Sequence, residues 1–284
     1  MTSRRRRRPG RPSRCLGGLP GCQGQLVAAL AAANPGVPLV LVVISGSPML
    51  LGATEALVAA HVNAGYPGSL GGRAIADVLL GAISPSGKLP YSIPAAAEGL
   101  PPMSEPSMTA GPGRTYRYGS GFSTPFGYGL SYTSFAYSGL ALSASAIAPC
   151  GGVALNVSVT NTGAWAGEQF PAEVVQAYVE FPPGTGAGAS AGFVAPRRLL
   201  RDFARVAVPP GTTTTVSLAL GAASFALVNP ADGLRYVLPG AYTLYVGGQQ
   251  PHQAKSAGQA PLAATVTVSG AGPTPFMACP GATQ

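Results

Sequence analysis

The chain has 284 residues, of which 46% are hydrophobic and 9% are charged, and this composition supports a packed core and argues against global disorder. The formal net charge of +8 comes mainly from seven arginines within residues 4–14, because the remainder carries ten basic and nine acidic residues. The body of the chain is therefore nearly neutral, and we expect it to have no basic face for nucleic acid.

The first segment, residues 1–14, is basic and contains Pro and Gly, and we interpret it as a disordered tail. A nuclear signal, a tail for anionic surfaces and a mis-called gene start are the alternatives. Residues 26–33 imitate a signal peptide and the acid-free start imitates a transit peptide, but neither pattern is complete, so the compartment stays open. No run reaches the ~18 apolar residues of a membrane span, and we expect no membrane partner.

Residues 15–95 are predicted to form an α/β unit. Residues 26–33 favour a helix, and the continuous apolar run at 39–44 predicts a strand buried on both faces of a parallel sheet. Within residues 73–80, positions 75, 78 and 79 are apolar and share one helical face, and a glycine follows at position 81. The glycines at 68–72 predict a tight strand-to-helix turn, with an anion site as the alternative.

Residues 96–134 are predicted to be a loop-rich connector with an unusual density of aromatic side chains. Large aromatic rings are usually buried, so we expect this segment to pack along a domain surface. The alternative is that the rings stack on sugars. The aromatic residues of this patch are Tyr116, Tyr118, Phe122, Phe126, Tyr128 and Tyr132.

Residues 135–248 are predicted to form an immunoglobulin-like β-sandwich, because short alternating strands are separated by Gly- and Pro-containing turns. Residues 249–284 are predicted to be a mostly disordered tail, with residues 263–268 as one further candidate strand. The positions predicted to face inward are Val153, Leu155, Val157 and Val159, then Val175, Ala177 and Val179, then Val216, Leu218 and Leu220, and finally Tyr242, Leu244 and Val246.

The sequence contains few candidate catalytic residues and none of the common catalytic motifs. It contains no nucleophile elbow, zinc-protease helix motif, P-loop or dinucleotide fingerprint. Of the two histidines, His61 is expected in the core or at its rim and His252 in the polar tail. Asp77 is expected on a helix and Asp232 in a turn. The nine carboxylates, which form no evident acid/base pair, are Glu55, Asp77, Glu98, Glu105, Glu168, Glu173, Glu180, Asp202 and Asp232.

The four cysteines, Cys15, Cys22, Cys150 and Cys279, lack the spacing of a zinc site, and their disulfide state stays open. Asn156 begins an Asn-Val-Ser glycosylation sequon, which matters if the chain is secreted. We therefore expect no catalytic residue, no metal site and no cofactor, and we assign no substrate-binding residue.

Several strings, taken in their order and spacing, resemble the family 3 glycoside hydrolases over residues 15–248. The first three resemble the α/β-sandwich domain of that family, the next two the connector after it, and the last three the fibronectin type III-like domain that closes many members. Asn63 stands where many members have Trp. The strings are AGYPG at 64–68, GGRAIADVLLG at 71–81, PSGKLP at 85–90, GRTYRY at 113–118, PFGYGLSY at 125–132, VTNTG at 159–163, VQAYV at 175–179 and PGAYTL at 239–244.

This resemblance implies an α/β fold followed by an all-β fold. The first part is a partial α/β sandwich at 15–95, in which helices flank a parallel-type sheet. The second is an immunoglobulin-like, fibronectin type III-like β-sandwich at 135–248, after the connector at 96–134.

The resemblance also bears on catalysis. In such enzymes a preceding barrel domain supplies an aspartate nucleophile and the α/β-sandwich domain usually supplies an acid/base glutamate, about 5–5.5 Å apart. Residues 14–23 resemble the string that follows this glutamate, but an Arg- and Pro-rich run occupies residues 8–13 instead. No segment resembles the barrel. The resemblance thus implies that both catalytic carboxylates are missing.

We therefore expect a C-terminal fragment of a family 3 glycoside hydrolase that is inactive alone. Met103 and Met108, before the GRTYRY string, resemble the β-xylosidase/arabinofuranosidase-like branch, which implies hydrolysis of O-glycosyl bonds in xylan catabolism. The alternative is a non-catalytic carbohydrate-binding or structural module with an oligo- or polysaccharide as partner. Missing first strands of the sheet imply an unpaired edge at residues 15–95, which favours self-association.

Overall fold

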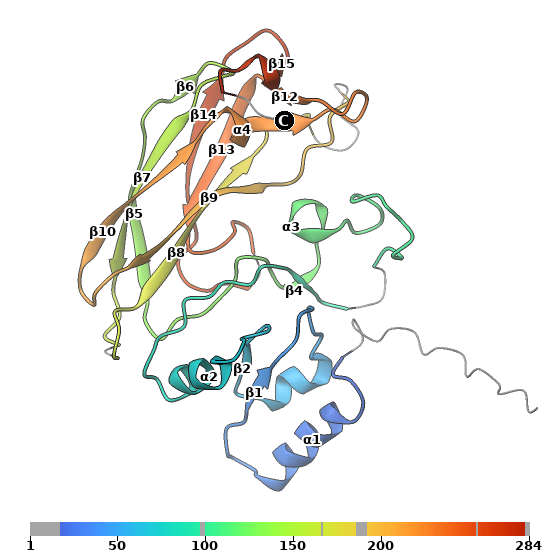
Figure 1. The fold of residues 1–284 in the computed structure, drawn as a ribbon, viewed down its shortest axis with the longest axis vertical. Coiled ribbons are helices and arrows are strands. Elements are labelled where there is room, and N and C mark those ends of the chain that lie inside the picture. Colours follow the sequence, from blue (N-terminus) through green and yellow to red (C-terminus); the bar gives the residue numbers. More distant parts are fainter. Residues whose placement is uncertain (1–17, 97–99, 166, 186–191, 254, 282–284) are drawn as a thin grey trace, which may run out of the picture. The chain divides into compact units, whose positions relative to one another are not determined.

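The computed structural model describes residues 18–96, 100–165, 167–185, 192–253 and 255–281. The predicted basic tail at 1–14 lies outside these residues. The chain divides into two compact units, residues 1–75 with 93–99 and residues 76–92 with 100–284 (Figure 1). Each unit is described by itself. Among the described residues, no helix is long and apolar enough to span a membrane.

The first unit is built around two parallel strands, β1 (Val40–Val43) and β2 (Ala60–Asn63). It also holds α1 (Gln23–Ala33), the 3-10 helix η1 (Gly52–Leu57), the first turn of α2 (Gly71–Leu79) and the short β3 (Ile93–Pro94). The predicted helix at 26–33 and strand at 39–44 are therefore confirmed as elements.

The predicted burial of the strand at 39–44 is wrong. Val43 is buried, but Val40 is 48% exposed and Ile44 is 60% exposed. The reason is that β1 has a single partner strand within the described part of the chain, so one edge and much of both faces stay open. Helix α1 likewise buries none of its residues.

The turn before α2 explains its glycines. Gly68 has a φ of +72°, and the Gly71 amide donates to its carbonyl at 3.1 Å. A Cβ on the buried Gly71 would overlap the Pro67 ring. The interpretation of residues 68–72 as a tight strand-to-helix turn is therefore supported by the backbone. Gly81, with a φ of +75°, follows the end of the helix as expected.

The second unit contains a β-sandwich of two main sheets (Figure 1). Within each sheet neighbouring strands are antiparallel, apart from the parallel pair β6 and β14. One sheet has the order β10 (Thr213–Leu220), β7 (Val153–Asn161), β5 (Phe135–Leu142). The other has the order β6 (Ala146–Ile147), β14 (Leu262–Val268), β13 (Gly240–Gly247), β8 (Ala172–Glu180), β9 (Leu199–Ala207).

Smaller elements complete this unit. A third sheet has the order β11 (Ala226–Val228), β12 (Arg235–Val237), β15 (Thr274–Pro275). The others are α3 (Thr115–Tyr118), β4 (Phe122–Thr124), α4 (Ala222–Phe225) and the 3-10 helix η2 (Phe276–Ala278).

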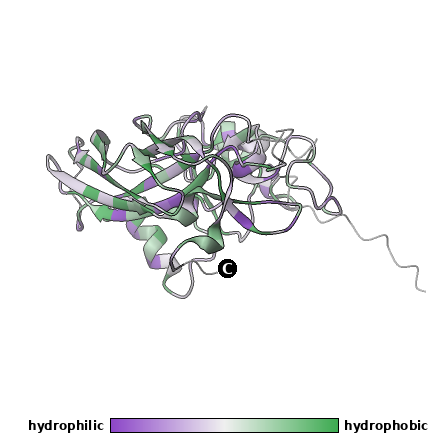
Figure 2. Cartoon of the chain, turned by 90° about the horizontal axis from the view of Figure 1, so that it is seen from above, coloured by the Kyte–Doolittle hydropathy of each residue, from purple (hydrophilic) through white to green (hydrophobic). Residues whose placement is uncertain are grey.

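The core of the sandwich follows the alternation seen in the sequence. All of the positions predicted to face inward are buried, and Val159, Val175 and Tyr242 are fully so. Hydrophobic and polar segments alternate along the strands in Figure 2. Burial of each Val or Leu side chain in this set contributes about 1.5–3 kcal/mol to the stability of the sandwich. The predicted fold class, α/β followed by a β-sandwich, is confirmed.

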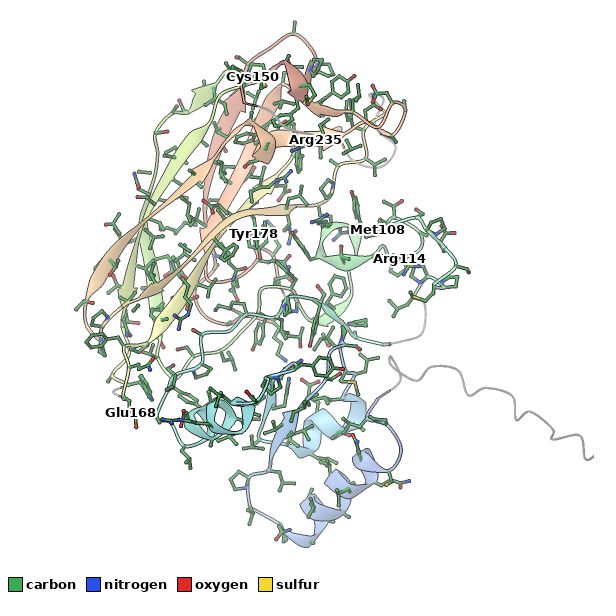
Figure 3. The ribbon with its side chains drawn as sticks, in the orientation of Figure 1. Met108, Arg114, Cys150, Glu168, Tyr178 and Arg235 are labelled. Atoms are coloured by element: carbon green, nitrogen blue, oxygen red, sulfur yellow. A yellow bond between two sulfur atoms is a disulfide. The ribbon has the colours of Figure 1, made fainter. Side chains whose placement is uncertain are left out.

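The prediction that residues 249–284 are mostly disordered is wrong for the described part of that segment. Strand β14 pairs with β13 along its length, and β15 adds to β12. A disulfide between Cys150 and Cys279 joins the segment to the start of β7 (Figure 3). The buried Val266 and Phe276 show why the segment orders, because each fills part of the sandwich core.

Candidate functional site

The second unit has a cavity of about 490 Å³ between the connector and one end of β8. Its lining includes Tyr118 and Ser120 from the connector, Glu180 at the end of β8, and Arg197 shortly before β9. This volume is within the range of small-ligand pockets. The lining thus includes an acidic residue, a basic residue and a tyrosine, whose side chains carry hydrogen-bonding groups.

Backbone and side-chain contacts fix the connector wall of this cavity. The Arg114 guanidinium donates to the carbonyls of Pro102 at 2.7 Å and Glu105 at 3.0 Å and so closes the loop in front of α3 (Figure 3). The Arg197 amide donates to the Arg117 carbonyl at 2.6 Å. These bonds join the connector to the segment before β9, and they hold the cavity wall in place.

Glu180 interacts with two partly buried groups, the Arg198 guanidinium and the Tyr245 phenol. Burial lowers the pKa of Arg198, and the nearby Glu180 carboxylate opposes this effect. Burial and then Glu180 raise the pKa of Tyr245. Arg198 also donates to the Pro251 carbonyl at 2.7 Å. The Glu180 carboxylate therefore faces a phenol and a guanidinium, and no second carboxylate lines the cavity among the residues that the structure describes.

A second polar cluster is buried elsewhere in the same unit. Lys88 Nζ lies 3.0 Å from Glu173 Oε1, and the two side chains are 12% and 7% exposed. Lys88 also donates to the Gly129 carbonyl at 3.2 Å. Burial raises the pKa of Glu173, and the Lys88 charge opposes this rise. Burial and the adjacent Glu173 raise the pKa of Tyr137 well above its usual range.

Two glutamines extend this polar contact between connector and sandwich. Gln176 Nε2 donates to the carbonyls of Gly127 at 3.1 Å and Gly248 at 3.0 Å. Its Oε1 accepts a 2.5 Å hydrogen bond from the Tyr178 hydroxyl. Gln250 Nε2 donates to the Phe126 carbonyl. Buried amides that are satisfied in this way specify one docking geometry, so we assign this cluster a structural role.

The aromatic residues of the connector are largely used in packing. Tyr116 stacks on Phe126 with ring centroids 4.3 Å apart, and Tyr178, which is labelled in Figure 3, meets Tyr116 edge-on at 6.3 Å. The Leu200 amide donates to the Tyr116 hydroxyl at 3.1 Å. The expectation that this patch packs on a domain surface is confirmed for these rings.

Three further acidic residues accept hydrogen bonds from backbone amides. Asp202 accepts from the Ala219 amide at 2.8 Å, and Asp232 accepts from the Leu234 amide at 2.9 Å within the expected turn. Glu105 accepts from the Ser107 amide at 2.9 Å. By accepting from these amides, the three carboxylates stabilise the local backbone conformation. Glu98 lies outside the described residues.

Neither histidine stands in a group of metal ligands. His61 lies half-buried on β2 as expected, and His252 lies against Tyr245, with its Nε2 3.1 Å from the tyrosine hydroxyl. Within the described ranges, no group of three or more His, Cys, Asp or Glu side chains is placed to hold a metal ion.

Sequence reasoning missed both polar clusters. Lys88, Glu173 and Glu180 each appear in the sequence as single charges, which usually belong to a solvated surface. One signal was available for Gln176, because a long polar side chain interrupts the apolar residues 174–179. A buried amide within a strand indicates a fixed hydrogen-bond partner.

The chain thus consists of an α/β unit followed by an immunoglobulin-like sandwich, and the cavity lies where the connector meets that sandwich. Residues 16–132 match the glycosyl hydrolase family 3 C-terminal domain, and residues 173–250 match a fibronectin type III-like domain. The chain thus carries the C-terminal domain of family 3 glycoside hydrolases followed by a fibronectin type III-like domain.

Known proteins share this arrangement. A periplasmic β-glucosidase of Salmonella typhimurium is 33% identical over 81% of this chain and 29% of its own length. A β-xylosidase of Formosa agariphila is 34% identical over 80% of this chain and 30% of its own length. The structure of a β-glucosidase from Erythrobacter marinus matches 89% of this chain and 30% of its own chain, with a TM-score of 0.70 and 31% identity. The chain thus spans about 30% of the length of these relatives.

Proposed function

We propose that this chain is the C-terminal part of a family 3 glycosidase that acts on β-linked xylosides or glucosides and is inactive alone. The match of residues 16–132 to the family 3 domain carries this proposal. The names of the relatives, β-xylosidase and β-glucosidase, supply the substrate class. This chain matches about 30% of the length of these relatives, so their catalytic groups can lie in the parts that it does not match.

The expected inactivity follows from the placement of carboxylates. Retaining hydrolysis needs two carboxyl groups about 5–5.5 Å apart, one as nucleophile and one as acid and base. Glu180 is the single acidic residue in the described lining of the cavity, and Glu173 is buried against Lys88. Neither arrangement offers a nucleophile with a partner acid beside an open space.

The test is an assay of the purified chain with nitrophenyl β-D-xylopyranoside and β-D-glucopyranoside. We expect no hydrolysis above the buffer rate and no difference between the chain and its Glu180→Gln variant. Hydrolysis by the chain that the Glu180→Gln variant lacks would show a catalytic site here and refute the proposed inactivity.

A second experiment tests the family role. A chimera carries residues 16–250 of this chain in place of the matching segment of the Formosa agariphila β-xylosidase. We expect this chimera to hydrolyse the xyloside. A folded chimera that binds but does not hydrolyse the substrate would contradict a role in that enzyme class.

Carbohydrate binding without catalysis is the second candidate function, and the polar cavity favours it. Tyr118 offers a ring, and Glu180 and Arg197 offer hydrogen-bonding groups to sugar hydroxyls. Titration with xylo-oligosaccharides, followed by calorimetry, tests this. Saturable binding that Arg197→Ala weakens at least tenfold supports it, and an absence of heat at millimolar sugar counts against it.

We also propose that the first unit self-associates through the open edge of β1. The support is the exposure of Val40 and Ile44 together with the single partner strand among the described residues. Light scattering of the wild type and of Val40→Lys tests it. A monomeric wild type at tens of micromolar would refute the proposal.

A further inference from the structure

We infer that Asn156 is an N-glycosylation site and that its glycan covers the outer face of the sheet formed by β10, β7 and β5. Two independent observations carry this inference. One is the exposure of a complete sequon in the folded chain, and the other is a disulfide of the kind that persists in oxidising compartments.

The sequon lies on the outer face of the central strand of this sheet. Asn156 is exposed, and the alternation of β7 places Ser158 on the same face, while Val157 between them is buried in the core. An Asn with a hydroxyl residue two positions later is the acceptor pattern of N-glycosylation. Asn156, Val157 and Ser158 form the one such sequon of this sequence.

The side chains around Asn156 leave room for a sugar. Its cross-strand partners are Ser217 on β10 and Ala141 on β5, both with short side chains. The Ser217 hydroxyl donates to Asn156 Oδ1 at 2.6 Å. That bond uses the amide oxygen and leaves Nδ2, the atom that would carry the glycan, without a hydrogen-bond partner among the described residues.

The surrounding face is unusual for a solvated surface. Strands β5, β7 and β10 contain no Asp, Glu, Lys or Arg. Surfaces of soluble proteins normally carry interspersed charges, which limit association. By contrast, β9 in the other sheet carries Arg201, Asp202 and Arg205. A bulky polar glycan at the centre of the uncharged face would supply the missing solvation.

The disulfide indicates the compartment in which this modification occurs. Cys150 and Cys279 are joined across 129 residues of sequence. Such bonds persist in secretory and extracellular compartments and are rare in the reducing cytosol. The same oxidising route is where sequons of secreted proteins are modified.

The order of synthesis lets the reaction precede folding. Strand β10 and Cys279 both follow Asn156 in the chain, so the sequon emerges before β7 gains that partner strand. The amide Nδ2 attacks the anomeric carbon of a lipid-pyrophosphate-linked oligosaccharide. A C–N bond forms, the C–O bond to the pyrophosphate breaks, Nδ2 loses one proton, and the lipid pyrophosphate leaves. The folded sheet then holds the glycan on its outer face.

Peptide mapping of the full chain, purified from the cells that naturally produce it, tests the inference. The peptide containing Asn156 should carry hexose and N-acetylhexosamine mass, and peptide N-glycosidase should convert this residue to Asp. The non-reduced map should show Cys150 linked to Cys279. A peptide with Asn156 wholly unmodified overturns the inference, whatever the state of the cysteines.

Matched variants, expressed in the same cells, separate glycosylation from misfolding. Ser158→Ala keeps Asn156 but removes the sequon, and it should abolish the gel-mobility shift that the glycosidase also abolishes. Ser158→Thr keeps the sequon and should retain the shift. Asn229→Gln, at an asparagine outside any sequon, should retain it as well. A shift that survives Ser158→Ala, or that is lost in Ser158→Thr and Asn229→Gln alike, overturns the assignment.

Discussion

Replacing Lys88 with Met should destabilise the second unit in a pH-dependent way. Lys88, whose side chain is 12% exposed, lies 3.0 Å from the buried Glu173, and it also donates to the Gly129 carbonyl at 3.2 Å. Met fills a similar volume, so the substitution removes the charge and the hydrogen bond without opening a large cavity. The Glu173 carboxylate is then left unpaired in an environment where it is 7% exposed.

The magnitude follows from this burial. Removal of one partner of a buried ion pair typically costs about 3–5 kcal/mol, because the other charge stays desolvated. We expect a loss of this size in the free energy of unfolding at pH 7. Lys88→Met with Glu173→Gln removes both charges, so the double variant should recover much of the loss.

The pH dependence has a definite sign. Burial raises the pKa of Glu173 in the folded chain above its ordinary value of 4.5, and Lys88 opposes the rise. Lys88→Met removes that opposition and raises the pKa further. The folded state then binds more protons than the unfolded state above about pH 4.5, so stability falls as pH rises, by at most about 1.4 kcal/mol per pH unit.

Urea unfolding between pH 5 and pH 8, followed by the fluorescence of Trp165, measures this effect. Trp165 is the one tryptophan of the chain, and it lies in the second unit beside Tyr132. The stability difference between wild type and Lys88→Met should widen as pH rises, and Glu173→Gln should flatten the profile. Parallel profiles, or a loss below about 1 kcal/mol at pH 7, would refute a buried charge pair.

Three further substitutions test other contacts of the second unit, and a fourth, Gly211→Ala, is the control for the first. Gly127→Ala should cost about 2–4 kcal/mol in urea unfolding, because φ is +78° there and a Cβ would overlap the Gln176 amide. Gly211→Ala, at a positive φ in open space, should cost less. Cys279→Ser should cost about 2–5 kcal/mol in oxidised protein and nothing once the wild type is reduced. Tyr242→Phe should cost about 1–2 kcal/mol, since its buried hydroxyl donates to a backbone carbonyl at 2.7 Å, and an unchanged melting temperature would contradict this.

Much of the sandwich could be predicted from the sequence because strands such as β7, β10 and β13 are buried mainly on one face. Val153, Leu155 and Val157 alternate with polar or small residues, and alternation with a period of two indicates a strand with one face in the core. For β1, by contrast, the sequence pattern gave a wrong prediction of burial. A continuous apolar run indicates burial on both faces only where strands and helices surround it, and β1 has β2 alone among the described residues.

The order of the C-terminal segment could not be predicted, because its stability comes from distant partners. Strand β14 is short, and it is stabilised by pairing with β13 and by burial of Val266 and Val268. The Cys150–Cys279 pair spans 129 residues, and sequence alone does not give disulfide connectivity. The polar, Gln- and Ala-rich composition of residues 249–261 gave no sign of these contacts.

The polar clusters were hidden for a related reason. A lone Lys or Glu in a sequence is solvated in most proteins, and only the close approach of residues 88 and 173 makes these two exceptional. Their position also bears on function. The charges and amides of this cluster join the connector to the sandwich and fix their relative geometry. A rigid unit of this kind suits a segment that matches about 30% of the length of its relatives. The carbohydrate binding that we propose would place the sugar in the cavity beside Glu180, because residues with polar side chains line it.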